Sequence, residues 1–203
     1  MKKLLLLSVL AFLSFGVDLS RAQTDDHPFA GAPTQYSVAV ITAQKTGAAL
    51  TMWMYVDQNK RRTEQETNNG RLVLILRGDL NLMYTIIVSH KAYRVAPLDP
   101  SLLESLGTYE VAKDMMLSHE KVGTETVKGE VCDKYHFSSP TDKNKSSHGL
   151  DRATSGYIWI SQSTHFPVMS KTEAATTSWE NLEIGPQEPS LFEPPTGYKR
   201  IDQ

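Results

Sequence analysis

The sequence predicts a mainly β (α+β) protein built on a strongly curved antiparallel sheet, an unclosed β-barrel of about 10–11 strands, with a short helical lid inserted mid-chain. Three observations predict this fold. Strand-like segments with alternating side chains follow one another from residue 35, most of them separated by short turns. Residues 99–116 are the one convincing helical stretch beyond the leader. The hairpin at 71–88 is apolar on both faces. An antiparallel strand pair with one face in water would be apolar on the other face only.

The first residues have the features of a secretory signal peptide. Two lysines precede an apolar stretch of about 14 residues, 4–17, which is shorter than the roughly 20 residues that a membrane-spanning helix needs. Ser20 and Ala22 then offer small side chains at the −3 and −1 positions of a cleavage site. We therefore expect residues 1–22 to be a leader that is cut after Ala22.

The rest of the chain is expected to have a flexible N-terminus, residues 23–34, and a single domain, residues 35–200. The formal net charge of −2 becomes about −4 without the leader, and no basic block remains, which argues against nucleic-acid binding. No later segment is long and apolar enough to span a membrane. Cys132 is the single cysteine, so an internal disulfide is excluded, and we expect its thiol to be buried.

Several strands are expected before the helical stretch, and alternation defines each of them. They are residues 36–42, 49–57, 60–67, 71–76, 82–88 and 92–96. The strand at 60–67 is polar on both sides, which is typical of an edge or solvent-washed strand.

The hairpin at 71–88 is the centre of the prediction. Its loop is either Gly78-Asp79 or the four residues 78–81, and both lengths are even, so both give the same faces. One face carries Leu72, Leu74, Leu76, Met83, Thr85 and Ile87. The other carries Val73, Ile75, Leu82, Tyr84, Ile86 and Val88. Since both faces are apolar, a second layer, a lid or an apolar ligand must cover each.

The helical lid is expected at 99–107 and 109–116. Asp99 can cap the first helix, Pro100 suits its first turn, and Gly107 suits its C-terminal end. The chain then returns to strands, and the expected segments share alternation and flanking turns. They are a hairpin at 117–138 turning at Lys128-Gly129, an exposed loop at 139–152, strands at 156–161, 168–175 and 177–184, and an extended tail at 190–198 anchored by Phe192 and Tyr198.

The sequence contains no catalytic motif that we can identify, and we expect no enzyme activity, cofactor or metal. His119 and His136 fall on one face of the predicted 117–138 hairpin and could share a metal with a third ligand, but solvent-facing histidines are the simpler interpretation. Aromatic residues on neighbouring strands have two interpretations, ordinary core packing or the wall of an apolar cavity. The candidate cavity-lining residues are Trp53, Tyr55, Val73, Ile75, Leu82, Tyr84, Ile86, Leu102, Leu103 and Leu106.

Several segments, taken together in order and spacing, resemble an uncharacterised family of exported bacterial proteins. They are Met54-Tyr55-Val56-Asp57, Lys60-Arg61-Arg62-Thr63-Glu64, Leu74-Ile75-Leu76-Arg77-Gly78-Asp79, Cys132-Asp133-Lys134-Tyr135, Tyr157-Ile158-Trp159-Ile160 and the tail from Pro189 to Tyr198. That family is similar in layout to the LolA/LolB-like lipoprotein-carrier superfamily. The resemblance implies a curved, unclosed sheet whose concave side is covered by helices, with a cavity that takes up acyl chains.

Two functions remain open from the sequence. In the first, the protein is a periplasmic binding protein, a carrier or sensor, that holds a lipid, a lipoprotein acyl chain or another apolar ligand between the concave sheet face and the helical lid. In the second, it is a structural or interaction protein of the cell envelope with a dry core and an envelope protein as partner. Both place the protein in the periplasm, or outside the cell, once the leader is removed.

Overall fold

The structure, a computed structural model, describes residues 28–68, 70–99, 118–139 and 154–201. These residues form one twelve-stranded sheet of order β12-β6-β5-β4-β3-β2-β1-β11-β10-β9-β8-β7. The strands are β1 (Gln35–Gln44), β2 (Leu50–Asp57), β3 (Lys60–Thr67), β4 (Gly70–Arg77), β5 (Leu82–Ile87), β6 (Ala92–Pro97), β7 (Ser118–Val127), β8 (Glu130–Ser139), β9 (Thr154–Ser161), β10 (Pro167–Thr172), β11 (Ala175–Ile184) and β12 (Lys199–Arg200). Every neighbouring pair is antiparallel except β12 and β6, which are parallel.

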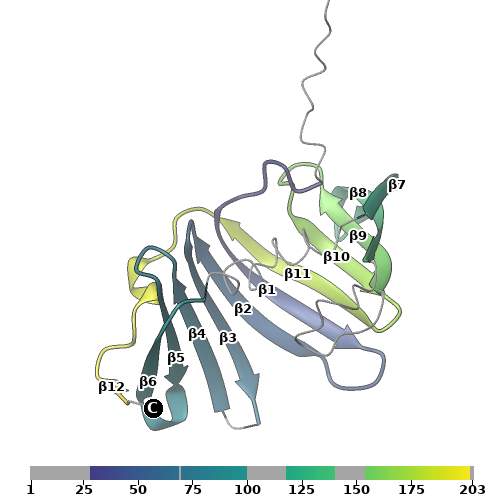
Figure 1. Cartoon of the computed structure of the whole chain (residues 1–203). Helices are drawn as coiled ribbons and strands as arrows, with labels where there is room; N and C mark the ends of the chain where they lie inside the picture. The colour runs from purple at the N-terminus through teal and green to yellow at the C-terminus, as the bar shows by residue number, and fades with distance from the viewer. Residues whose placement is uncertain (1–27, 69, 100–117, 140–153, 202–203) are drawn as a thin grey trace, which may run out of the picture.

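The sheet is bent and does not close. In Figure 1 the strands at its two ends, β5–β6 and β7–β8, lie nearer the viewer than β1 and β2 in the middle, so the concave face is toward the viewer. The predicted curved antiparallel sheet is therefore confirmed. The predicted helical lid is not supported, because residues 100–117 lie outside the described part of the chain. The helices that the structure describes are two short 3-10 turns, η1 (Val88–His90) and η2 (Pro189–Phe192). None of these described helices is long and apolar enough to cross a membrane.

The central hairpin has the predicted register. Leu74 lies opposite Thr85 and Ile75 opposite Tyr84, and the ladder ends at Arg77 and Leu82, so the loop is the four-residue alternative. Lys128 and Gly129 also form the predicted two-residue turn between β7 and β8. Both residues have positive φ, 50° and 86°, which is the backbone that a type I′ hairpin turn requires.

Irregularities in the ladders accompany the curvature. The register shifts between Ser37 and Ala39 in β1, between Pro167 and Met169 in β10, and between Lys121 and Gly123 in β7. A β-bulge inserts an extra residue in one strand, which bends that strand and increases its twist. Bulges at three places along the sheet are therefore one physical cause of its bent shape.

The β7 bulge also overturns one predicted face. His119 lies opposite Phe137 and makes an edge-to-face contact with Tyr135, with ring centroids 6.1 Å apart, whereas His136 makes one with Tyr157 at 5.2 Å. The prediction that the two histidines share a face is wrong, because the extra residue shifts the alternation of β7 by one. His119 and His136 therefore cannot form the metal pair that the regular hairpin suggested.

Of the two alternatives for the strand at 60–67, an edge strand or a solvent-washed one, the edge is wrong. As β3 it lies between β2 and β4, far from either edge of the sheet. Its polar side chains form ion pairs with one another and with β4, among them Arg62 with Glu64 and Arg71 with Glu66, both at 2.6 Å. A polar strand is tolerated at this central position because its charges are paired across the surface.

Residues of alternate parity divide between the two faces. On the concave face, one buried cluster contains Tyr36, Val38, Val40, Met54, Val56, Phe166 and Trp179, and a second contains Phe29, Phe137, Ile158 and Ile160. On the convex face, one cluster contains Val73, Ile75, Tyr84, Ile86 and Phe192, and another contains Cys132, Trp159 and Val168. Phe29 is fully buried, so the described part of the expected flexible N-terminus is held by the core. Cys132 is buried as predicted.

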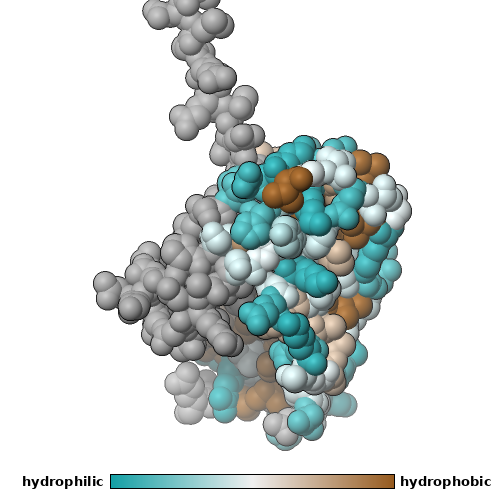
Figure 2. Space-filling view, turned by 90° about the vertical axis from the view of Figure 1, so that its right-hand side faces the viewer, coloured by the Kyte–Doolittle hydropathy of each residue, from teal (hydrophilic) through white to brown (hydrophobic). Residues whose placement is uncertain are grey.

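The outer side of the β7–β10 end is mainly hydrophilic. Figure 2 shows this side with hydrophobic side chains scattered among polar ones. Val122 and Val131 are among the exposed apolar residues of these strands. Single exposed apolar side chains are normal on a protein surface and indicate no binding site.

Candidate functional site

The concave face of the central hairpin carries an apolar surface. Leu74, Met83 and Ile87 alternate with the convex residues of β4 and β5, and all three are half-buried. None of them belongs to the buried clusters that the described residues form. On the concave face, β3 places Arg61, Thr63 and Gln65 between this surface and the buried cluster around Met54 and Val38. The concave face therefore offers apolar area that described side chains only partly cover.

The convex face of the same hairpin is filled by the end of the chain. Residues 185–201, which we call the C-terminal strap, run across the outside of β3–β6 and contain η2 and β12 (Figure 1). Phe192 is fully buried among Val73, Ile75 and Tyr84, and Leu191 and Tyr198 pack around it. The predicted anchors of the tail are thus confirmed, and they explain how one apolar face of the hairpin is covered.

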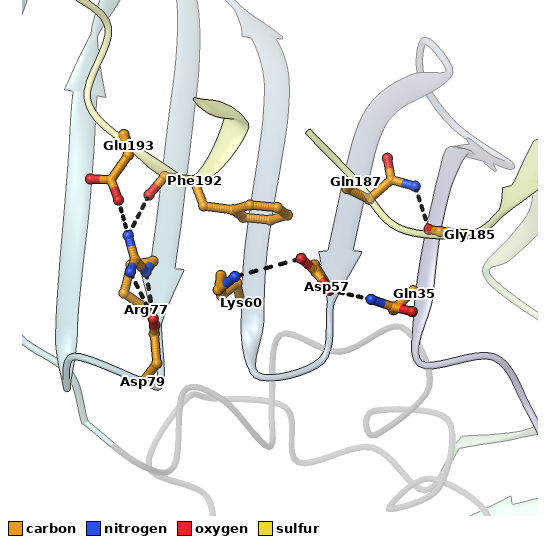
Figure 3. A network of polar contacts seen from close by, with 9 residues as sticks. All are labelled: Gln35, Asp57, Lys60, Arg77, Asp79, Gly185, Gln187, Phe192 and Glu193. Carbon is orange, nitrogen blue, oxygen red and sulfur yellow. Dashed lines mark hydrogen bonds and ion pairs between the residues drawn. The ribbon is translucent and has the colours of Figure 1, made fainter. Parts of the chain in front are cut away.

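Arg77 fastens the strap to the sheet. It donates hydrogen bonds from Nε and Nη2 to the Asp79 carboxylate at 2.8 and 2.7 Å, and from Nη1 to the Phe192 carbonyl at 3.4 Å (Figure 3). It also forms an ion pair with Glu193. The hydrogen bonds to Asp79 hold the pKa of Arg77 well above its ordinary value, and they lower the pKa of Asp79. Arg77 is only 9% exposed, and its charge is compensated by the carboxylates of Asp79 and Glu193.

Two further basic residues and an edge strand complete the attachment. Arg62 Nη1 donates to the Leu191 carbonyl at 2.9 Å, and Lys60 Nζ lies 5.7 Å from the centre of the Phe192 ring. β12 then adds to the edge of β6 in parallel, with Ile201 N donating to the Tyr93 carbonyl at 2.9 Å. The strap therefore also covers the edge strand that would otherwise carry unpaired backbone groups.

The sequence-predicted cavity residues lie on the convex side. Val73, Ile75, Leu82, Tyr84, Ile86 and Tyr55 come together as predicted, but the side chain in their midst is Phe192. Burial raises the pKa of both Tyr55 and Tyr84 above the ordinary value of tyrosine. Leu102, Leu103 and Leu106 lie outside the described residues. Whether any member of this set contacts a ligand stays a prediction.

Trp53 is separate from that cluster. It is 41% exposed and borders a hollow of about 340 Å³ on the convex face, together with Leu50 and the ion-paired side chains of Glu64, Glu66 and Arg71. These charges already satisfy one another, so the hollow offers no unpaired charged group to a ligand.

The described residues contain no group of three or more His, Cys, Asp and Glu side chains that could hold a metal ion. Burial raises the pKa of the Cys132 thiol, which makes the thiolate scarcer and the side chain less reactive.

Two features were missed from the sequence. The Arg77–Asp79–Glu193 network joins the central hairpin to the tail, and the only signal was an arginine directly after the apolar run at 72–76. Trp179 was not among the aromatic candidates, yet it is buried on the concave face, 9% exposed, and its Nε1 has no hydrogen-bond partner among the described residues. Nothing in the alternation of β11 distinguishes Trp179 from an ordinary core residue.

Comparison with solved structures gives a fold likeness. An uncharacterised conserved protein from Thermus thermophilus is similar with a TM-score of 0.57 at 9% identity, covering 87% of this chain and 94% of that chain. LprF from Mycobacterium bovis follows at a TM-score of 0.48 and 11% identity, covering 80% and 93%. A LolA superfamily protein from Nitrosomonas europaea has a TM-score of 0.33 at 10% identity, covering 80% and 90%. At such identities these likenesses concern the fold alone, and only the first has a TM-score above 0.5.

No curated protein matches the sequence. The family described as "Domain of unknown function (DUF4412)" matches residues 37–152, more than half of the chain. The predicted resemblance to an uncharacterised family is thereby confirmed. The chain belongs to the DUF4412 family.

Proposed function

We propose that the protein is a binding protein of the cell envelope, a carrier or sensor, that holds an apolar molecule such as a lipid against its concave face. One observation carries this proposal. The central hairpin is apolar on both faces, and the strap fills the convex one, whereas Leu74, Met83 and Ile87 on the concave one stay half-buried. The exported location follows from the leader expected at residues 1–22, and the partner would be a lipid or a lipoprotein acyl chain.

The energetics favour a long apolar ligand. Burial of each methylene contributes about 0.8 kcal/mol, so twelve methylenes contribute roughly 10 kcal/mol before ordering costs. Association and ordering cost several kcal/mol or more, which leaves enough for useful affinity. Hydrophobic burial is non-directional, so such a site needs no cluster of polar groups.

The alternative is a structural or interaction protein of the envelope whose concave face is dry and permanently packed. It is favoured by the strap, which shows that this chain can cover its own apolar surface. The two functions differ in one measurable property, saturable uptake of an acyl probe.

Two adjacent residues of β5 provide the test. Met83 and Leu82 are both half-buried apolar side chains, but Met83 lies on the concave face and Leu82 on the convex face. Delipidated, refolded protein is titrated with a fluorescent fatty acid, and urea unfolding confirms that each variant is folded. We expect micromolar, saturable binding that Met83→Asp weakens at least about tenfold and Leu82→Asp leaves within about threefold, since a charge on the ligand face must be desolvated.

Each other result has a definite meaning. Weakening by Leu82→Asp alone would place the ligand under the strap, among the residues predicted from the sequence. Absence of saturable binding by the wild-type protein would reject the binding function in favour of the structural alternative.

A further inference from the structure

Trp179 has a buried hydrogen-bond donor without an acceptor. It lies on β11 opposite Val40, in the concave cluster with Tyr36 and Phe166, and is 9% exposed. No acceptor in the described part of the chain lies within hydrogen-bond distance of its Nε1. The contrast is Trp159 on the convex face, whose Nε1 donates to Glu125 at 2.7 Å.

Such a donor is costly. A buried N–H group that finds no partner costs about 1–3 kcal/mol, and buried polar groups in native proteins almost always have a partner. The indole nitrogen can only donate a hydrogen bond, so its partner must carry an acceptor oxygen or a similar atom. The cost is recovered if a ligand brings that acceptor to the concave face.

The surroundings of Trp179 suit the polar end of such a ligand. Two residues before it on β11, Thr177 shares a hydrogen bond of 3.1 Å with Thr42 of β1. Ser170 of β10 lies opposite Thr177 on the same face and is half-buried. Three hydroxyl groups therefore lie one pleat away, about 7 Å along the strand. One hydroxyl of the Thr42–Thr177 pair donates to the other, which leaves two hydroxyls that can donate to an oxygen.

Apolar side chains lie beyond this polar end, on both sides of the polar strand β3. From β11 the concave face continues across β1, β2 and β3 to β4 and β5, five strand spacings of about 4.8 Å each. Val40 and Met54 lie along this way, and Leu74 and Met83 at its far side. Beyond Trp179 the side chains on β1, β2, β4 and β5 are largely apolar, and those of β3 between them, Thr63 and Gln65, are polar but uncharged. This arrangement matches a molecule with one acceptor group and a long hydrocarbon part.

We infer that Trp179 Nε1 donates a hydrogen bond to the carbonyl or carboxylate oxygen of an acyl ligand whose chain runs along the concave face. The inference rests on the proposed function and narrows its ligand class to acyl compounds, since a plain hydrocarbon has no acceptor. Trp179 is here a specificity-determining residue, and the hydrophobic surface supplies most of the affinity.

The test observes the indole N–H signals of the wild-type ¹⁵N-labelled protein by NMR. The three tryptophans, Trp53, Trp159 and Trp179, give three signals, which single Trp→Phe variants assign. The ligands are a pyrene-labelled fatty acid and the pyrene-labelled alkane of the same length. We expect the fatty acid to move the Trp179 indole proton downfield, as a new hydrogen bond does, while the alkane binds without this shift.

Affinities give a second measurement. Trp179→Phe removes the donor and keeps an aromatic ring. We therefore expect about 5- to 10-fold weaker binding of the fatty acid and unchanged affinity for the alkane. Trp159→Phe is the matched control, because it removes a donor on the other face, and it should leave fatty-acid binding unaltered.

The possible failures are distinguishable. If the fatty acid binds and the Trp179 signal stays in place, the inference is overturned and the proposed function survives. This is the result expected if a buried water already accepts the indole hydrogen bond. If neither probe binds the wild-type protein, the proposed function fails and the inference falls with it. The NMR result does not depend on the stability of any variant at residue 179.

Discussion

Replacing Phe192 by alanine tests whether the strap is a layer of the fold or a loosely attached tail. Phe192 is the one strap residue that is fully buried, and its ring fills the space among Val73, Ile75 and Tyr84. Phe192→Ala therefore removes the centre of the convex cluster and leaves the sheet residues around it unchanged.

The expected loss follows from what else holds the strap. A buried Phe→Ala change typically costs about 3–5 kcal/mol. The remaining attachment includes hydrogen bonds from Arg77 to the Phe192 carbonyl, from Arg62 to the Leu191 carbonyl, and from the Lys199 and Ile201 amides to β6 and its approach. Each contributes about 0.5–1.5 kcal/mol, so the loss is comparable with the sum of these four hydrogen bonds. The strap of the variant should open locally before the sheet unfolds.

Hydrogen exchange at the Lys199 and Ile201 amides measures this opening directly. A local loss of about 3 kcal/mol corresponds to roughly 100-fold faster exchange at these two amides, with the amides of β1 and β11 nearly unchanged. Ile184→Ala is the control, because Ile184 lies just before the strap, is 56% exposed, and should change stability by less than about 0.5 kcal/mol. An increase of less than about tenfold in Phe192→Ala would refute the reasoning that this ring holds the strap.

Two further predictions concern the sheet and its charges. Gly156→Ala should destabilise the protein by several kcal/mol in urea unfolding, because a Cβ there would lie 2.2 Å from the Lys171 carbonyl oxygen; Gly123→Ala, with no atom within 4 Å, is the control and should change little. The pKa of Asp79 is lowered in the folded protein by its hydrogen bonds from Arg77, so this pair stabilises the fold above the ordinary aspartate pKa of about 3.9 and the contribution disappears as the pH falls through the lowered value. Asp79→Asn should therefore lose stability at pH 7 and show a shallower decline between about pH 5 and pH 2; an acid decline as steep as that of the wild type would contradict this assignment.

Local patterns in the sequence were sufficient for the strands and their pairing in hairpins. Alternation of β-branched and aromatic residues set the faces of β4 and β5, and the parity of the loop at 78–81 fixed their register. The turn at Lys128-Gly129 was also predictable from local sequence. Its two residues have the positive φ of a two-residue hairpin turn, which glycine adopts readily.

Features that depend on long-range pairing were not predictable. The bulge at Lys121 and Gly123 changes the face of His119, and no local pattern marks it. The polar strand β3 resembles an edge strand in isolation, and only its pairing with both β2 and β4 places it centrally. Alternation also cannot tell which face becomes concave, because the bend is a property of the whole sheet.

The sheet order explains how the strap reaches the convex face of the central hairpin. β1 pairs with β2 on one side and with β11 on the other, so the two halves of the chain meet in the middle of the sheet. The family match ends at residue 152, before β9–β11 and the strap, so the matched part alone would leave β1 and β8 without one partner each. After β11 the strap runs along the convex side of β3–β6, where Phe192 packs in the convex cluster and β12 pairs with β6. The pairing of β11 with β1 also puts Trp179 opposite Val40, on the concave face. β11 therefore carries Trp179 on one face of the sheet and is followed by the strap on the other face.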